Sequence, residues 1–426
     1  MRPLTVTSLS RAVLPPGSLL GGLLLAACND ATVPLDTGEA LCGGPIYVPR
    51  SGIDTSEPVL ADVDEARFGT LAPDPAQVHL SWADDPATTI SIVWRTDGDT
   101  LASQVQYGVS ESYGATATGA SFFVAGGEEW GRIHEARLCG LTPGSTVHYR
   151  VGGEGHWSPD RTFTAAPPAG STERFRFLMA GDSRDNQAVW AQILDAAEAH
   201  APEFYVFTGD AVDLGTNLEE WDAWYAAGDG HYDEHVVLNA HGNHEFQTQT
   251  YYALVALPGN EQWYSFDYGP AHFTALNDTV AAADDFQIQA DWMADDLAAA
   301  TTPWRFVYHH MPAYTSCERH AGNTTLQALW SPVEEAAGVA VDFTGHNHNY
   351  ERSYAMRDRV ATEGGTTYVV SGGAGADLYD NQLANAYTAV AAVTDNYVIV
   401  DVDGASVSLT AYDLAGNVLD TWSMAK

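Results

Sequence analysis

Apolar and polar residues follow a two-residue period in the first part of the chain. In "TTISIVWRT" the apolar residues Ile90, Ile92 and Trp94 lie on one face of an extended strand, and "STVHYRVGG" repeats the alternation. Clusters of turn residues such as "TDGD" and "TPGS" separate these runs. Several short strands with such breaks predict an all-β sandwich over residues 73–167.

The period changes after "TAAPPAGSTE" (164–173), a linker rich in Pro, Gly and Ser. "RFRFLMAGD" predicts a buried strand, and the segment after it predicts a helix because apolar residues recur at helical spacing, at Val189, Ile193, Leu194 and Ala197. Strand, helix and strand patterns follow in "FYVFTGD", "NLEEWDAWYAAG" and "EHVVLNAHGNHE", and from about residue 365 the pattern is β again. This alternation predicts a layered α/β domain over residues 174–425.

The N-terminal residues have the pattern of a secretory signal. Arg2 and Arg11 precede "SLLGGLLLAAC", an apolar stretch too short to span a bilayer. It ends in Leu-Ala-Ala-Cys28, which resembles the lipobox of bacterial lipoproteins, and a plain signal peptide is the alternative. We expect residues 1–28 to be the signal and residues 29–72, rich in Pro, Gly, Asp and Thr, to be a tether and irregular lead-in. The protein would then be secreted across the inner membrane and lipid-anchored at Cys28 in the bacterial cell envelope.

Chain length, net charge and cysteine content restrict the domain organisation and the possible partners. The 426 residues exceed one ordinary core, so two folded domains are expected. The formal net charge of −38 repels nucleic acid phosphates, which argues against nucleic acid as a binding partner, and a lipid anchor is the only membrane contact we expect. In an oxidising compartment a disulfide is permitted, and we expect Cys42 to pair with Cys139 because Cys317 is distant in sequence. The oligomeric state does not follow from the sequence.

Nearly every predicted strand of the second domain ends in a group that can bind a cation. These groups are Asp182, Asp210, Asn243 with His244, His309 with His310, and His346 with His348. In an open α/β sheet, the carboxyl ends of the strands are where sites form. A mixed Asp, Asn and His set suits first-row cations better than calcium. Four of the five fragments carry a Gly before the ligand, so we read them as one metal site rather than as separate helix caps or packed histidines.

The motifs carry a family resemblance. GD, GDxxD, GNHE, HxPxY and GHxHxYER, at residues 181–352, resemble the five blocks of the calcineurin-like metallophosphoesterases. The last two blocks, with the preceding "IHEARLCGLTPGSTVHYRVGG", resemble the purple acid phosphatase branch. The resemblance implies a fibronectin-III-like domain followed by a four-layer αββα sandwich. It also implies hydrolysis of phosphate monoesters by a hydroxide held between two metal ions, of Fe, Zn or Mn.

The resemblance also implies which residues bind the metals. One ion would take Asp210, Asn243, His310 and His346, and the other would take Asp182, Asp210 and His348. The chain departs from the family at two positions: Arg184 stands where the wider superfamily has His, and Asp213 stands where the purple branch has its metal-binding Tyr. Asp213 would either replace that tyrosine as an oxygen ligand or pair with Arg184.

Other histidines have separate expected roles. His244 would contact the phosphate and His320 would protonate the leaving alkoxide, although His320 would equally fit a solvated loop. His309 points opposite to His310 on its strand and is expected to be packed. The substrate is expected to be a small phosphate ester. Two alternatives stay open: a phosphodiesterase or nucleotide hydrolase using the same site, and a non-catalytic cell-surface binding protein with a degenerate metal site.

Overall fold

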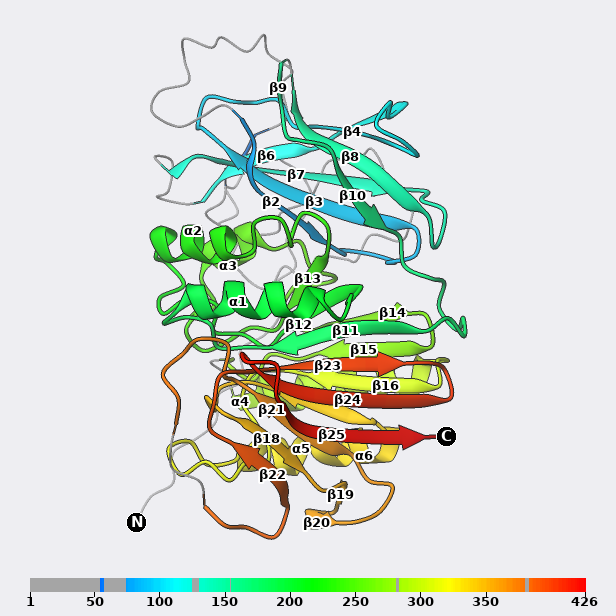
Figure 1. Ribbon diagram of the computed structural model, residues 1–426, viewed down its shortest axis with the longest axis vertical. Coiled ribbons are helices and arrows are strands. Elements are labelled where there is room, and N and C mark those ends of the chain that lie inside the picture. The colour runs from blue at the N-terminus through cyan, green and yellow to red at the C-terminus, as the bar shows by residue number, and fades with distance from the viewer. Residues whose placement is uncertain (1–53, 57–73, 125–129, 154, 281–282, 380–382) are drawn as a thin grey trace, which may run out of the picture. The chain divides into compact units, whose positions relative to one another are not determined.

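The computed structural model describes residues 54–56, 74–124, 130–153, 155–280, 283–379 and 383–426, which all belong to one compact unit, Val33–Lys426 (Figure 1). The predicted signal, the lipidation site Cys28 and Cys42 lie outside the described residues. Cys139 is disulfide-bonded, and Cys317 is free and buried. No helix among the described residues has the length and apolar character needed to cross a bilayer.

Short strands form the first domain, as the two-residue period predicts. One sheet contains β6 (Ala120–Phe123), β7 (Arg132–Cys139), β3 (Thr89–Thr96) and β2 (Ala76–Ser81), and the lead-in adds β1 (Asp54–Ser56) beside β6. The facing sheet contains β10 (Arg161–Thr164), β8 (Thr146–Gly153), β4 (Gln104–Gly108) and β5 (Ala115–Thr118), with β9 (His156–Trp157) paired to β8. The predicted all-β fold of this domain is confirmed.

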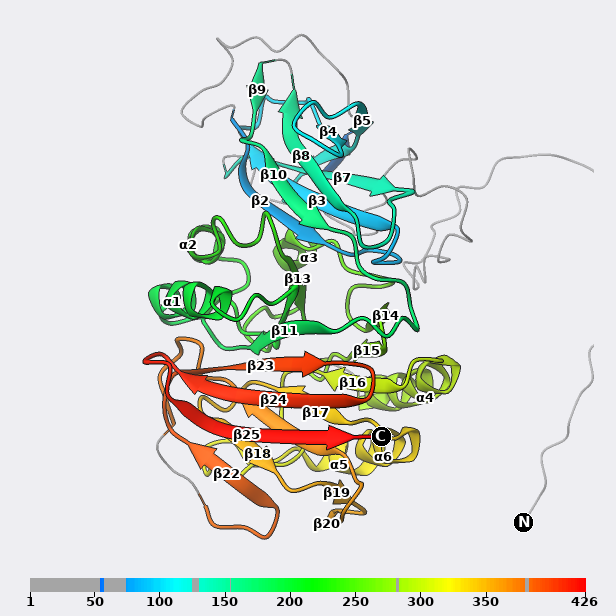
Figure 2. The ribbon, with the colours of Figure 1, turned by 45° about the vertical axis from the view of Figure 1, so that its right-hand side comes forward.

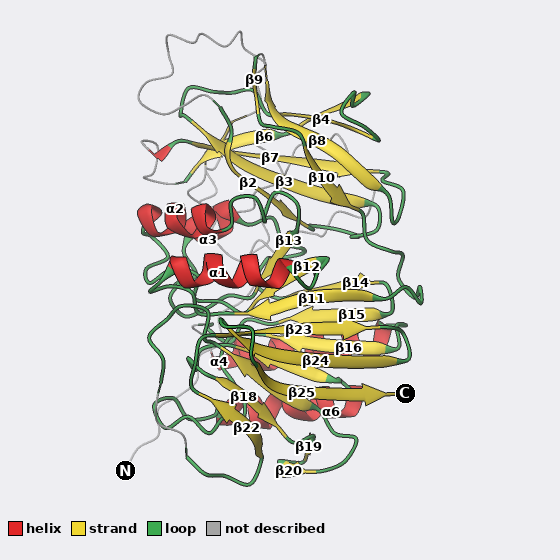
Figure 3. Ribbon diagram, viewed as in Figure 1, coloured by secondary structure: helices red, strands yellow, loops and turns green. Residues whose placement is uncertain are grey.

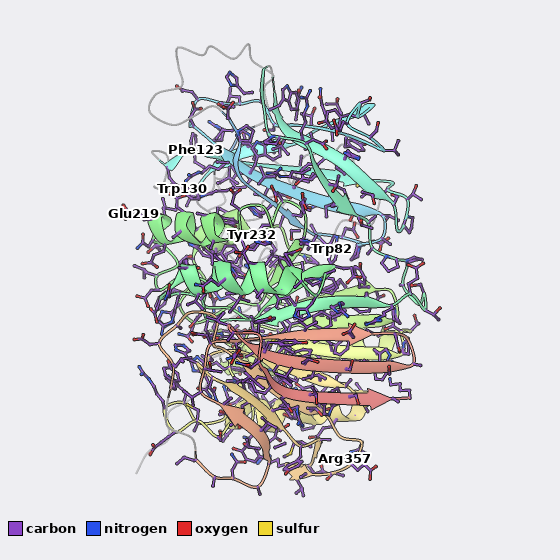
Figure 4. All side chains as sticks on the ribbon, in the orientation of Figure 1. Trp82, Phe123, Trp130, Glu219, Tyr232 and Arg357 are labelled. Carbon is purple, nitrogen blue, oxygen red and sulfur yellow. The ribbon has the colours of Figure 1, made fainter. Side chains whose placement is uncertain are left out.

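The first sheet continues into the second domain. β2 pairs in parallel with β13 (Val236–Asn239), where Leu80 aligns with Val236 and its N–H donates to the carbonyl of Tyr232. Trp82 packs against Phe204 next to this junction; Trp82 and Tyr232 are labelled in Figure 4. The two domains therefore share an eleven-stranded sheet, a continuity that the linker in the sequence did not indicate.

Two sheets face each other in the second domain (Figures 1 and 3). The first continues through β12 (Phe204–Phe207), β11 (Phe175–Ala180), β23 (Asn396–Val402), β24 (Ser406–Asp413) and β25 (Val418–Ala425). The second has the order β14 (Tyr264–Tyr268), β15 (Ala271–Ala275), β16 (Trp304–Tyr308), β17 (Val341–Thr344), β21 (Thr367–Ser371), β18 (Tyr350–Ser353) and β22 (Thr388–Ala392). β19 (Met356–Arg357) and β20 (Val360–Ala361) form a separate hairpin. Phe177 on one sheet meets Phe306 and Phe343 on the other edge to face, within a shared core.

Helices lie against part of the outer face of each sheet (Figure 2). On the first sheet lie α1 (Gln187–Glu198), α2 (Leu218–Ala227) and α3 (Gln249–Leu254), and on the second lie α4 (Ala283–Ala299), α5 (Thr324–Leu329) and α6 (Ser331–Ala337). α1 buries Trp190, Ile193, Leu194 and Ala197, while Val189, which we expected in the buried stripe, is only half-buried. The predicted layered α/β fold of this domain is confirmed.

Candidate metal centre

The chain turns sharply where strands of both sheets end. β11, β12 and β13 run parallel, as do β15, β16 and β17, so their carboxyl ends meet at one edge. Asp182, Asp210 and His346, each a short distance beyond its strand, have positive φ angles of 64°, 57° and 64°. Such angles are costly for residues other than glycine, and they gather where a functional site over-determines the backbone.

Two glycines show how closely these turns approach one another. A side chain at Gly345 would place its Cβ 2.2 Å from Oδ2 of Asp182, and one at Gly242 would place its Cβ 2.2 Å from the backbone nitrogen of Asp210. Neither position has room for a methyl group. The glycine before the ligand, visible in the motifs, thus allows one strand end to pack against the next.

Four predicted ligands come together around the ring of His310. Its Nδ1–H donates to the carbonyl of Thr208 at 2.8 Å, so Nε2 is the nitrogen that binds either a proton or a cation. That nitrogen lies 3.0 Å from Oδ1 of Asn243, 3.2 Å from Nδ1 of His346 and 3.4 Å from Oδ1 of Asp210. Acceptor atoms so arranged repel one another unless a positive charge lies among them, and a cation fits this donor set.

The pKa values of His310 and His346 show where a positive charge is favoured in this group. Burial by itself would lower the pKa of His310, but the carboxylate of Asp210 outweighs it and raises the pKa to about 10. Burial and the neighbouring His310 together lower the pKa of His346 to about 2. Asp210 therefore favours one positive charge at His310, and that charge together with burial disfavours a second one on His346.

The predicted ligands of the second metal ion lie beside those of the first. Oδ1 of Asp182 lies 3.5 Å from Nε2 of His348, and His348 Nδ1–H donates to the carbonyl of Asp377 at 2.6 Å. Asp182 is fully buried, and its Oδ1 has no hydrogen-bond partner within the described residues. An unpartnered buried carboxylate oxygen beside an imidazole lone pair is the arrangement that a bound cation completes.

Arg184 borders this second set. Its Nε lies 3.7 Å from Oδ2 of Asp210 and its Nη1 lies 2.7 Å from Oδ1 of Asp213. The Asp213 side chain is 56% exposed, and its backbone carbonyl lies 2.8 Å from Nδ1 of His244. The described geometry pairs Asp213 with Arg184, while a ligand role for Asp213 stays a prediction.

The two predicted catalytic histidines flank the centre. His244 Nε2 lies 3.9 Å from Oδ2 of Asp210, and the backbone N–H of His244 donates to Oδ1 of the same residue at 2.9 Å. The ring of His320 lies 4.5 Å from the ring of His346, and its backbone carbonyl accepts a hydrogen bond from Asn347. Both rings are only half-buried and so lie at the open side of the site.

Two further residues belong to the centre although the motifs did not assign them a role. Tyr379 stacks on His348 with ring centroids 4.0 Å apart, and its hydroxyl lies 3.3 Å from Nε2 of that histidine. Glu245, buried within the GNHE motif, accepts hydrogen bonds from the backbone of Asp210, Ala211 and Gly242. Glu245 could have been found from the motif, but Tyr379 follows a Gly-rich loop with no such signal.

Comparison with known proteins agrees with this geometry. The domain described as "Purple acid Phosphatase, N-terminal domain" matches residues 75–165, and "Calcineurin-like phosphoesterase" matches residues 175–350. Purple acid phosphatase 22 of Arabidopsis thaliana is 28% identical over 331 residues, covering 71% of this chain and 72% of that protein. Acid phosphatase type 7 of Homo sapiens is 26% identical over 359 residues, covering 74% and 81%. The structure of purple acid phosphatase PPD1 from yellow lupin seeds superposes with a TM-score of 0.73 at 19% identity, covering 83% of this chain and 74% of that one.

Proposed function

The chain belongs to the purple acid phosphatases, within the calcineurin-like phosphoesterases, and we propose that it hydrolyses phosphate monoesters at the candidate metal centre. The family hydrolyses phosphoesters, acts on small phosphate-ester substrates and uses a dinuclear metal centre. The preference for monoesters, the choice of Fe, Zn or Mn, and the individual ligands are our proposal.

Two cations at this centre would supply an activated water and Lewis acidity toward the phosphoryl oxygens. We assign one ion to the residues around His310, namely Asp210, Asn243, His310 and His346, and the other to Asp182, Asp210 and His348. The chain's own contribution is rigidity, because Glu245 fixes the loop of Asp210 and the carbonyl of Thr208 fixes the ring of His310.

The observation that carries the monoester preference is the presence of two arginines and two histidines at the open side of the centre. The Arg184 guanidinium lies 3.7 Å from Asp210, and Arg319 lies over the ring of Tyr379 at 4.4 Å. His244 and His320 add two imidazoles that can donate hydrogen bonds. A phosphate monoester carries one more negative charge than a diester, so these groups stabilise it more strongly.

We propose His320 as the group that protonates the leaving group, and the support is that its ring lies beside that of His346 at the solvent-facing side. General-acid help matters most for a poor leaving group. We therefore expect His320→Ala to lower kcat for an alkyl phosphate more than for p-nitrophenyl phosphate. An equal loss of kcat for the two substrates would assign His320 to substrate binding rather than to protonation of the leaving group.

The deciding experiment compares p-nitrophenyl phosphate with bis(p-nitrophenyl) phosphate after loading with Fe, Zn or Mn. We expect kcat/KM for the monoester to exceed that for the diester by about tenfold or more, the effect of about 1.4 kcal/mol of extra charge stabilisation. The Arg184→Met variant should have a smaller ratio of kcat/KM for the monoester to kcat/KM for the diester. A larger value for the diester would favour the phosphodiesterase alternative, and no turnover by metal-loaded protein would favour a binding protein.

We also propose that the protein is lipid-anchored at Cys28 in the bacterial cell envelope. The support is the "LAAC" sequence after a short apolar stretch, since Cys28 lies outside the described residues. A diacylated cysteine carries two chains, which is enough for stable anchoring.

A further inference from the structure

A second cluster of ionisable side chains lies behind the candidate metal centre. Consecutive residues of a strand point to opposite faces, so His309 points away from the site that His310 serves. His309 is fully buried and lies between two carboxylates, Asp278 and Asp342. Glu334, from α6, completes a group with His309 and Asp342 whose ligand atoms all lie within 4.8 Å of one another.

Asp278 holds the ring of His309 in one orientation. Its Oδ2 accepts a hydrogen bond from Nδ1–H of His309 at 2.8 Å and another from the backbone N–H of Met311 at 2.6 Å. A carboxylate that fixes one ring nitrogen and leaves the other free is the usual support of a metal-binding histidine. The other ring nitrogen, Nε2, lies 3.2 Å from Oδ2 of Asp342.

The contact between His309 and Asp342 is a long hydrogen bond, and its length also suits two ligands of one cation. Charge-assisted N–H···O bonds measure about 2.7–2.9 Å, as His309 does to Asp278, whereas Nε2 of His309 lies 3.2 Å from Oδ2 of Asp342. Two ligand atoms at about 2.0–2.2 Å from one cation are about 3.0–3.5 Å apart. The contacts of His310 in the candidate metal centre span the same range, from 3.0 to 3.4 Å.

The pocket also has oxygen atoms without donors. Among the described residues neither Oδ1 of Asp278 nor Oδ1 of Asp342 has a hydrogen-bond partner, although both residues are buried. With all three carboxyl groups ionised, two negative charges would stay uncompensated even when His309 is protonated. A buried cluster of this kind requires a further positive charge, which is either a shared proton or a cation.

We propose that His309, Asp342 and Glu334 bind a third divalent cation, of the zinc or manganese class, separate from the catalytic pair. The His, Asp and Glu donor set suits such an ion, and Asp278 supports it through His309. The cation ties α6 to β17 and to the residue after β16, whose ends carry His346 and His310. Its role is structural: it fixes the helix layer against the strands that position the catalytic ligands.

A metal count in a chain with a disabled catalytic site tests the proposal. Full-length protein carrying Asp210→Asn and His346→Asn is produced with zinc in the medium, dialysed against EDTA and measured by mass spectrometry. Because the cluster is buried, we expect about one zinc per chain to remain, as for a structural ion bound during folding. Adding Asp342→Asn should remove it.

His272 offers a matched control. It too lies between two carboxylates, Asp267 and Asp296, at 2.8 and 3.0 Å, but no third carboxylate joins them in the described structure. His272→Gln in the same background should leave the zinc in place. Zinc lost equally in both variants would overturn the proposal, as would a background chain that retains none.

A second measurement covers the case in which Asp342→Asn does not fold. Glu334→Gln changes only charge on the helix side, and circular dichroism reports whether it folds. In crystals of the zinc-loaded wild-type chain we expect an anomalous-scattering peak between His309 and Asp342. A crystal without that peak shows that protons balance the cluster, and the proposal then fails.

Discussion

Replacing Asp213 by Asn tests the position where this chain leaves its family. The structure places Oδ1 of Asp213 at 2.7 Å from Nη1 of Arg184, and the Asp213 side chain is 56% exposed. The substitution keeps the backbone carbonyl that contacts His244, so it removes charge without removing that contact. If Asp213 neutralises Arg184, the variant leaves a guanidinium without this partner beside Asp210.

The expected magnitude follows from the exposure of the pair. An exposed ion pair contributes about 0.2–1 kcal/mol, and the upper limit corresponds to about a fivefold change in rate. Loss of a charged metal ligand should be more costly, because even residues that only support a ligand change metal affinity by about 10–100-fold. We therefore expect Asp213→Asn to retain activity within about tenfold of wild type, and added metal not to restore the loss.

The assay is hydrolysis of p-nitrophenyl phosphate during titration with Mn²⁺ or Zn²⁺. Arg184→Met and the double variant complete a cycle, in which the double variant should lose less activity than the two single changes predict together, as contacting partners do. Asp185→Asn is the comparison, because Asp185 contacts the same guanidinium at the longer distance of 3.3 Å. Recovery of Asp213→Asn at saturating metal would refute the pairing and make Asp213 a ligand.

Three more changes have defined outcomes. Asp210→Ala should abolish phosphatase activity and lower the metal content while the β-sandwich stays folded, and activity within tenfold of wild type would exclude the shared-ligand assignment. Burial lowers the pKa of His272, but the hydrogen bonds that its ring donates to two carboxylates outweigh burial and raise the pKa to about 9. Its stabilisation, on the order of 2 kcal/mol, is therefore complete below pH 6.5 and lost as the pH rises through about 9, so the unfolding free energies of wild type and His272→Gln should converge at high pH. The Cys28→Ser variant should not partition into the detergent phase, whereas wild type should. Equal partitioning of the two proteins would exclude the lipid anchor.

The motifs and the periodicity of the sequence predicted most of the fold and of the site, because both depend on local sequence patterns. Ligands at strand ends converge by topology, so Asp182, Asp210 and His346 could be brought together without coordinates. What could not be predicted depends on contacts between distant segments. β2 joins β13 through a register set in three dimensions, and Tyr379 reaches His348 from a loop without a motif.

Strand alternation shows where a sequence pattern stops being informative. It correctly indicates that His309 and His310 face opposite sides of the sheet, and from this we expected His309 to be packed. His309 is indeed buried, with Trp330 edge-on at 5.2 Å, but packing alone does not explain why Asp342 lies against it. A buried carboxylate needs a compensating charge, and whether that charge is a proton or a cation depends on the distances among His309, Asp342 and Glu334. The pair His309–His310 therefore places two charge centres on opposite faces of the same sheet, and only one of them is visible in the motif.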